Sequence, residues 1–176
     1  DLPEDYREKL VNVQYLSAVL LILVMDRPLT DKYWISIADH DLPFVGIIEH
    51  TNMIDRSLYG GHHIVYLTNY PSRESELYQK SAEELMEELT PHLRRLNPDF
   101  ERSWVLEYHH HKVDGAQPII GTNYSERIPD HRTPIKNLYL ANTTQIYPED
   151  RGTNYSVRMG RQVARMVLED AGEAVD

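Results

Sequence analysis

The stretch VNVQYLSAVLLILVM, Val11–Met25, decides the fold because Val, Leu, Ile and Tyr continue through it almost without interruption. It is longer than a typical strand of about 5–6 residues, yet its β-branched residues favour an extended backbone. We therefore predict one long, well-buried strand here. Its most apolar part, Ala18–Met25, is far shorter than the ~20 residues that a membrane-spanning helix needs, so we expect no integral membrane segment.

Three more strands are predicted directly after this one. Residues 33–38 alternate between two faces with the period of two that a strand requires. Residues 44–50 follow a polar turn that ends in proline, and residues 62–69 follow Gly60-Gly61. Strands that follow one another without intervening helices favour an antiparallel sheet.

A helix is predicted to begin after Ser81. Its hydroxyl can accept the backbone N–H of Glu84, whose side chain can reach back to Ser81, which is a capping box. The apolar stripe of this helix is Ala82, Leu85, Met86, Leu89, Leu93 and Leu96. Pro91 is expected to kink the helix or restart it, because proline lacks the N–H that a helix interior uses.

The remaining segments complete an α+β fold. Period-two patterns predict extended segments at 104–113 and 117–122, a compact apolar strand at 138–141 and a final helix at 154–168. We predict a mainly antiparallel or mixed sheet with packed helices.

Composition narrows the function. The chain has 176 residues, no Cys and a net charge of -10, which predicts one globular domain and no nucleic-acid partner, because phosphate-backbone binders need a basic surface. The lack of cysteine excludes thiolate metal sites, thiol nucleophiles and disulfides. It is also typical of a reducing compartment, and we expect a cytoplasmic protein.

The histidine run at 109–111 permits two interpretations. On a strand, His109, His111 and Glu107 share one face, where they could bind a metal ion. The alternative is a solvated polar face opposite Trp104 and Leu106, and we favour it because no second ligand pair such as HExxH occurs. We therefore expect no metal site, while a metal-dependent enzyme stays open as an alternative.

The eight glycines cannot form either GxGxxG or GxxxxGK[ST], so the chain carries no complete nucleotide-phosphate loop. It also opens on DLPEDY rather than on Met, which is typical of sequence from within a protein. We therefore expect a processed chain or an excised fragment.

The most informative segment is LYLANTTQIYPEDRGTNYSVRMGRQVA, residues 138–164. It predicts a strand that ends in Asn142-Thr143-Thr144, a polar loop, and a helix that starts near Thr153. The free N–H groups and dipole of a helix start favour an anion, and the Asn and Thr side chains supply short hydrogen-bonding groups. A plain strand, loop and capped helix is the alternative.

This segment resembles the C-terminal FAD-contacting piece of the amine oxidase, protoporphyrinogen oxidase and phytoene desaturase superfamily. There a strand near LYLAGD leads into a helix with a pattern near SGxxAA, which Leu138–Ala141 and Gly160–Ala164 match. The stretches DLPFVGIIEHTN at 41–52 and AQPII at 116–120 are similar to a bacterial and archaeal branch of FAD-dependent oxidoreductases. Two departures are Asn142-Thr143, where many relatives have Gly-Asp or Gly-Glu, and the lack of Gly-Ala at 153–155.

The resemblance implies a substrate-domain sheet and a C-terminal FAD-contacting fragment of a flavin-dependent oxidoreductase that transfers a hydride from substrate to FAD. Residues 1–136 would be the sheet and helix of the substrate domain, residues 137–170 the FAD-contacting strand, loop and helix, and residues 171–176 an acidic tail. The partner would be an N-terminal Rossmann domain that this sequence lacks. The chain alone would be inactive and without bound FAD, and a surface freed of that domain would permit self-association.

The resemblance also implies the site residues. The FAD contacts would be Asn142, Thr143, Thr144, Gly152, Thr153, Asn154 and Tyr155. A small-molecule substrate would meet His50, Asn52, Tyr66 and Gln117. No catalytic residue or substrate class follows. The competing hypothesis is an independent α+β module that binds a ligand or a peptide without catalysis.

Overall fold

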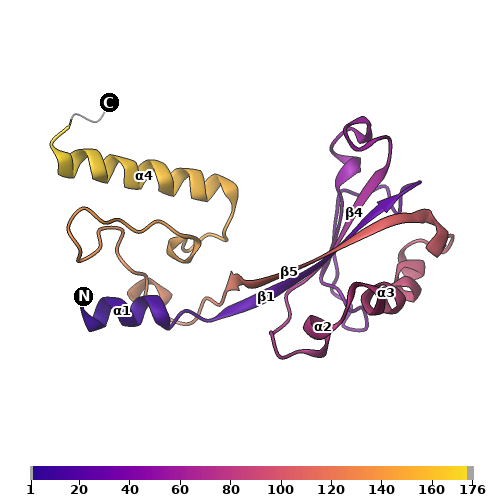
Figure 1. The fold of residues 1–176 in the computed structure, drawn as a ribbon, viewed down its shortest axis with the longest axis horizontal. Coiled ribbons are helices and arrows are strands. Elements are labelled where there is room, and N and C mark those ends of the chain that lie inside the picture. The colour runs from indigo at the N-terminus through magenta and orange to yellow at the C-terminus, as the bar shows by residue number, and fades with distance from the viewer. Residues whose placement is uncertain (1, 174–176) are drawn as a thin grey trace. The chain divides into compact units, whose positions relative to one another are not determined.

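The computed structural model describes residues 2–173 and divides the chain into two compact units. One unit is continuous, Tyr15–Gln117, and carries the sheet; we call it the sheet unit. The other joins the two ends of the chain, Asp1–Gln14 and Pro118–Asp176, and we call it the terminal unit. Figure 1 shows the first helix and the last helix in the terminal unit. The predicted boundary at 136/137 separates a substrate-domain part from an FAD-contacting part. It is a division by function, which the two compact units do not test, so it stays a prediction.

The sheet unit is built on five strands in the order β2-β3-β4-β1-β5. The strands are β1 (Tyr15–Met25), β2 (Trp34–Ser36), β3 (Gly46–Glu49), β4 (His63–Asn69) and β5 (Val105–Pro118). The pairs β2-β3, β3-β4 and β4-β1 are antiparallel. The predicted α+β class with consecutive antiparallel strands is confirmed, with each of the first four strands shorter than expected.

The pairing register separates two faces of this sheet. Ile35, Ile47, Leu67 and Leu21 pair in a row across four strands, and the last three are nearly inaccessible. This face holds the main core, which also contains Leu85, Met86, Leu89 and Leu93 of α3. The opposite face carries the row Trp34, Ile48, Tyr66 and Ile22, which is half-buried or exposed. We call it the open face.

Helix α3 (Ala82–Leu96) follows the short α2 (Glu76–Gln79) and begins with the predicted capping box. Ser81 Oγ accepts the N–H of Glu84 at 3.3 Å, and Glu84 Oε2 accepts the N–H of Ser81 at 2.7 Å. The helix is assigned continuously through Pro91, so the restart expected there is wrong. Leucines 85 and 89 before the proline and Leu93 after it are all buried in the same core. This shared packing stabilises a single continuous helix.

The terminal unit contains α1 (Glu4–Val11) and α4 (Thr153–Ala171), with short 3-10 turns between them at Tyr124–Glu126 and Thr143–Gln145. Ile146, Met159 and Val163 form a small core here, with Tyr139 and Tyr155 against it. The final helix is confirmed and extends beyond the predicted 154–168. The expected acidic tail lies outside the described residues from 174 on. No helix among residues 2–173 is long and apolar enough to cross a membrane.

Two sequence predictions are wrong in this unit. The strand expected to start at Val11 begins at Tyr15, because α1 reaches Val11 and places acidic Glu4 and Asp5 in its first turn, where the helix dipole favours them. Residues 138–141 form no strand. Tyr139 makes one isolated bridge with Arg132 instead, because the described terminal unit offers no sheet edge to extend it.

Candidate functional site

The turn after residue 141 is built by its own polar side chains. Asn142 Oδ1 accepts the backbone N–H of Thr144 at 3.0 Å and also the Thr144 hydroxyl, while Gln145 Oε1 accepts the N–H of Asn142. Thr144 is buried, so its hydroxyl serves the turn. Among residues 2–173 the Asn142 side-chain NH₂ and the exposed Thr143 hydroxyl have no recorded hydrogen bond. These two groups are the ones that a ligand could contact.

The start of α4 presents backbone N–H groups. Its N-cap residue Gly152 has no side chain to cap them, and the first three N–H groups of a helix have no partner within the helix. A Cβ added at Gly152 would lie 2.7 Å from Asn154 Oδ1, so glycine leaves room for that amide. Thr153 and Asn154 are exposed, while Tyr155 is half-buried and lies under the Arg158 guanidinium, 4.8 Å from its ring centroid.

Three contacts connect the turn to the rest of the terminal unit, and one of them runs from the Gln145 side-chain NH₂ to the Pro129 carbonyl at 3.0 Å. The Tyr124 hydroxyl donates to the Thr144 carbonyl at 2.7 Å in a buried environment. Ile146, which directly follows the turn, packs on Met159 and Val163 of α4. The turn and α4 are therefore held by one small core, and sequence reasoning missed Tyr124 because nothing local marks its partner twenty residues away.

In the sheet unit the structure brings His50 and Tyr66 together. Their ring centroids lie 6.0 Å apart, and His50 Nε2 lies 2.7 Å from the hydroxyl of Tyr59. Tyr59 also meets His50 edge to face at 5.3 Å. The three rings form a polar aromatic cluster beside the open face. Tyr59 was not predicted, because it lies outside any strand and only the fold places it against His50.

Asn52, predicted as a substrate contact, holds a loop of its own unit. Its side-chain NH₂ donates to the carbonyls of Thr30 and Lys32 at 3.1 and 3.0 Å. Glu49 fixes the same loop, because its two carboxylate oxygens accept the N–H groups of Leu29 and Thr30 at 3.0 and 2.6 Å. Both amide hydrogens of Asn52 are therefore already in use.

Glu49 is a buried acid that the site prediction left out. It is fully inaccessible, and burial of the carboxyl raises its pKa, although the N–H groups of Thr30 and Leu29 oppose that shift. His63 Nδ1 lies 3.9 Å from the carboxylate, and burial lowers the pKa of this imidazole. The signal in the sequence was the strand alternation, which places Glu49 on the same face as buried Ile47.

The other predicted groups stand apart from this cluster. Gln117 is half-buried near the end of β5, with no recorded side-chain hydrogen bond in the described chain. His109 Nε2 lies 3.3 Å from the Glu107 carboxylate, and both side chains are about half exposed or more. Within residues 2–173 no three His, Asp or Glu side chains gather in a way that could hold a metal ion.

Comparison with known proteins identifies a family and a fold. The profile of the family described as flavin containing amine oxidoreductase matches residues 1–168. A structure from Exiguobacterium sp. 255-15, provisionally assigned as a protoporphyrinogen oxidase, matches 92% of the chain with a TM-score of 0.71 at 12% identity. An oxidoreductase from Methanosarcina mazei matches 93% with a TM-score of 0.63 at 16% identity.

The chain spans 36% and 37% of the length of these two solved proteins. At such identities the likeness shows a shared fold. No curated protein is significantly similar in sequence to the chain.

Proposed function

The chain belongs to the flavin containing amine oxidoreductase family, and on that premise we propose that it supplies the substrate-domain sheet and a flavin-contacting turn and helix of a flavin-dependent oxidoreductase. The observation that carries the proposal is the family match, which spans both units. The predicted Rossmann partner domain and the cytoplasmic location are part of the same proposal.

The terminal unit has groups that suit FAD. The cofactor carries phosphate, ribityl and ring oxygens that accept hydrogen bonds. The uncapped N–H groups of α4, the Asn142 NH₂ and the Thr143 hydroxyl are all able to donate them. Gly152 gives its room to the exposed Asn154 side-chain amide, whose Oδ1 would lie 2.7 Å from a Cβ at this position. Thr144 would position the turn rather than contact FAD, because its hydroxyl and its backbone N–H both donate to Asn142 Oδ1.

Bound FAD would supply the redox chemistry by accepting a hydride from a small-molecule substrate. The residues of this chain would bind and orient. The helix dipole and free N–H groups at Thr153–Tyr155 would stabilise negative charge on the bound group. The open face, with His50 and Tyr66 and now Tyr59, would shape the substrate side. Because these contacts are only part of such a site, we expect the chain alone to bind FAD weakly and to be inactive.

The test measures flavin content in the protein expressed with its full natural reading frame. Asn142→Asp keeps the Oδ1 that caps the turn but removes the NH₂ donor and adds a negative charge, and Thr143→Val removes only a hydroxyl. We expect both variants to bind FAD more weakly. The affinity should fall about tenfold for each charge-assisted or well-placed hydrogen bond that is removed.

Thr122→Val is the matched control, because Thr122 is an exposed threonine of the same unit. It should leave the flavin-to-protein ratio unchanged. Full FAD occupancy in both test variants would remove Asn142 and Thr143 from the site.

A further inference from the structure

Within residues 2–173, helix α4 buries side chains along one of its faces. With 100° between successive residues, its buried residues Met159 and Val163 lie on one side. A second side carries Arg158, Arg161 and Arg165, one helical turn apart and exposed. The helix therefore presents a continuous row of guanidinium groups away from its core.

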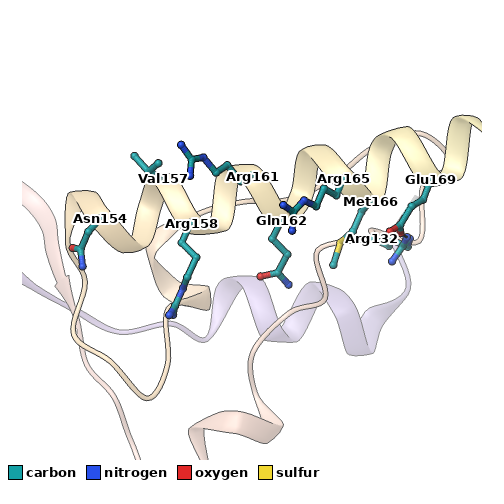
Figure 2. A pocket seen from close by; sticks show the side chains of 9 residues that line it. All are labelled: Arg132, Asn154, Val157, Arg158, Arg161, Gln162, Arg165, Met166 and Glu169. Carbon is teal, nitrogen blue, oxygen red and sulfur yellow. Dashed lines mark hydrogen bonds and ion pairs between the residues drawn. The ribbon is translucent and has the colours of Figure 1, made fainter. Parts of the chain in front are cut away.

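This row borders a cavity of about 530 Å³ within the terminal unit. Its polar lining is Arg132, Asn154, Arg158, Arg161, Gln162, Arg165 and Glu169. Figure 2 shows these side chains along one stretch of α4, with Arg132 meeting Glu169 at the C-terminal end. A cavity of this size is in the range that holds a small molecule. We call it the arginine groove.

The charges of the groove are only partly neutralised. Arg132 pairs with Asp170 and Glu169, and Arg158 pairs with Glu149. Arg161 and Arg165 have no recorded ion pair or hydrogen bond with any residue of the described range 2–173. Two guanidinium groups, four residues apart, thus border the cavity without an ion-pair partner in that range.

The arrangement of charge along α4 opposes helix stability. Residues 151–165 contain four arginines and no acidic residue, although the whole chain has a net charge of -10. The helix has no acidic residue in its first turn and no basic residue in its last, while Glu169 and Asp170 lie near its C-terminus. Because a helix dipole favours the reverse order, Arg158 and Arg161 raise an already positive potential in the N-terminal half of α4.

We propose that the arginine groove binds a small polyvalent oxyanion, with Arg161 and Arg165 as its principal ligands and Gln162 as a neutral hydrogen-bonding neighbour. Guanidinium groups present paired N–H donors that match the oxygens of phosphate and carboxylate groups. Glu169 disfavours an anion at the C-terminal end, which places the ligand toward Arg161. Asn154, a proposed flavin contact, lines the N-terminal end of the groove, whereas Asn142 and Thr143 do not line it. Arg161 and Arg165 are not among the proposed flavin contacts, so binding there is tested without flavin.

The test is calorimetric titration of the flavin-free chain at constant, low ionic strength with pyrophosphate and, in a second arm, citrate. We expect saturable binding that weakens as KCl is raised. Arg161→Gln and Arg165→Gln should each weaken it about tenfold or more, the loss expected for a charge-assisted contact. Preference for pyrophosphate would identify a phosphate ligand, and preference for citrate a carboxylate ligand; either supports the proposal.

Arg73→Gln is the matched control, because Arg73 is an exposed arginine of the sheet unit. It should leave binding unchanged. Arg161→Lys and Arg165→Lys keep the charge and should restore part of the affinity. Absence of saturable binding in the unaltered chain, or equal loss with Arg73→Gln, would overturn the proposal. Far-ultraviolet circular dichroism confirms that each variant is folded.

Discussion

Replacing Tyr124 with phenylalanine would test whether the candidate flavin-contacting turn is held from outside itself. Tyr124 is 6% exposed, and its hydroxyl donates to the Thr144 carbonyl at 2.7 Å. The Phe variant keeps the ring and its contact with Tyr147, whose centroid lies 5.7 Å away. The change therefore removes one hydrogen bond and leaves a buried carbonyl oxygen without that donor.

The expected loss is about 1–2 kcal/mol in the free energy of local opening, since a hydrogen bond contributes about 1 kcal/mol and an unsatisfied buried group costs about 1–3 kcal/mol. Such a loss would make the amide hydrogens of the turn exchange with solvent about 5–30 times faster. The assay is amide hydrogen exchange followed by mass spectrometry in peptides that cover residues 119–147. Tryptophan fluorescence would not serve, because Trp34 and Trp104 both belong to the sheet unit.

Tyr147→Phe is the matched control. Tyr147 is 42% exposed, and its hydroxyl has no recorded hydrogen bond within residues 2–173. We expect its exchange to match that of the unaltered protein. If Tyr124→Phe exchanged no faster than this control, the argument that a distant hydroxyl fixes the turn would be refuted.

Two further predictions concern the sheet unit, both measured by urea unfolding. Glu49→Ala leaves the buried N–H groups of Leu29 and Thr30 without acceptors and should cost about 2–4 kcal/mol in acid. Burial raises the pKa of Glu49, so the native state holds the carboxyl proton more tightly than the unfolded chain does. The difference in free energy of unfolding between the unaltered protein and Glu49→Ala should therefore shrink as pH rises from the ordinary carboxyl pKa of about 4.3 through the raised value. A difference that grows with pH would contradict this prediction. Ser81→Ala removes the N-cap of α3 and should cost about 1 kcal/mol at neutral pH, and no change in the urea midpoint would speak against the capping box.

Features that depend on a few neighbouring residues could be predicted from sequence. The capping box at Ser81 and Glu84 needs only four residues, and the alternation in β2 to β4 needs only a strand period. The family resemblance rested on residues 138–164 and is confirmed by the profile match. The same segment also misled, because LYLA reads as a strand but has one isolated bridge to Arg132.

The candidate site could be predicted less completely, because its contacts join residues that are distant in sequence. His50 and Tyr66 were both predicted, but Tyr59 completes their cluster only through the fold. Asn52 was predicted as a ligand contact, and its NH₂ group bonds the loop at 30–32. No sequence pattern distinguishes an amide that faces a ligand from one that holds a loop.

The sequence by itself determined the α+β class, the antiparallel pairing of consecutive strands, the cap of α3, the family and the positive charge of residues 151–165. Each follows from residue type and short spacing, which act through backbone hydrogen bonds and side-chain periodicity. Only the tertiary structure decided that Glu49 binds a loop twenty residues away and that Tyr124 holds Thr144. It also decided that Arg161 and Arg165 border a cavity without an ion-pair partner among residues 2–173. Those outcomes depend on which distant groups meet when the chain closes its loops, and local preference does not fix that choice.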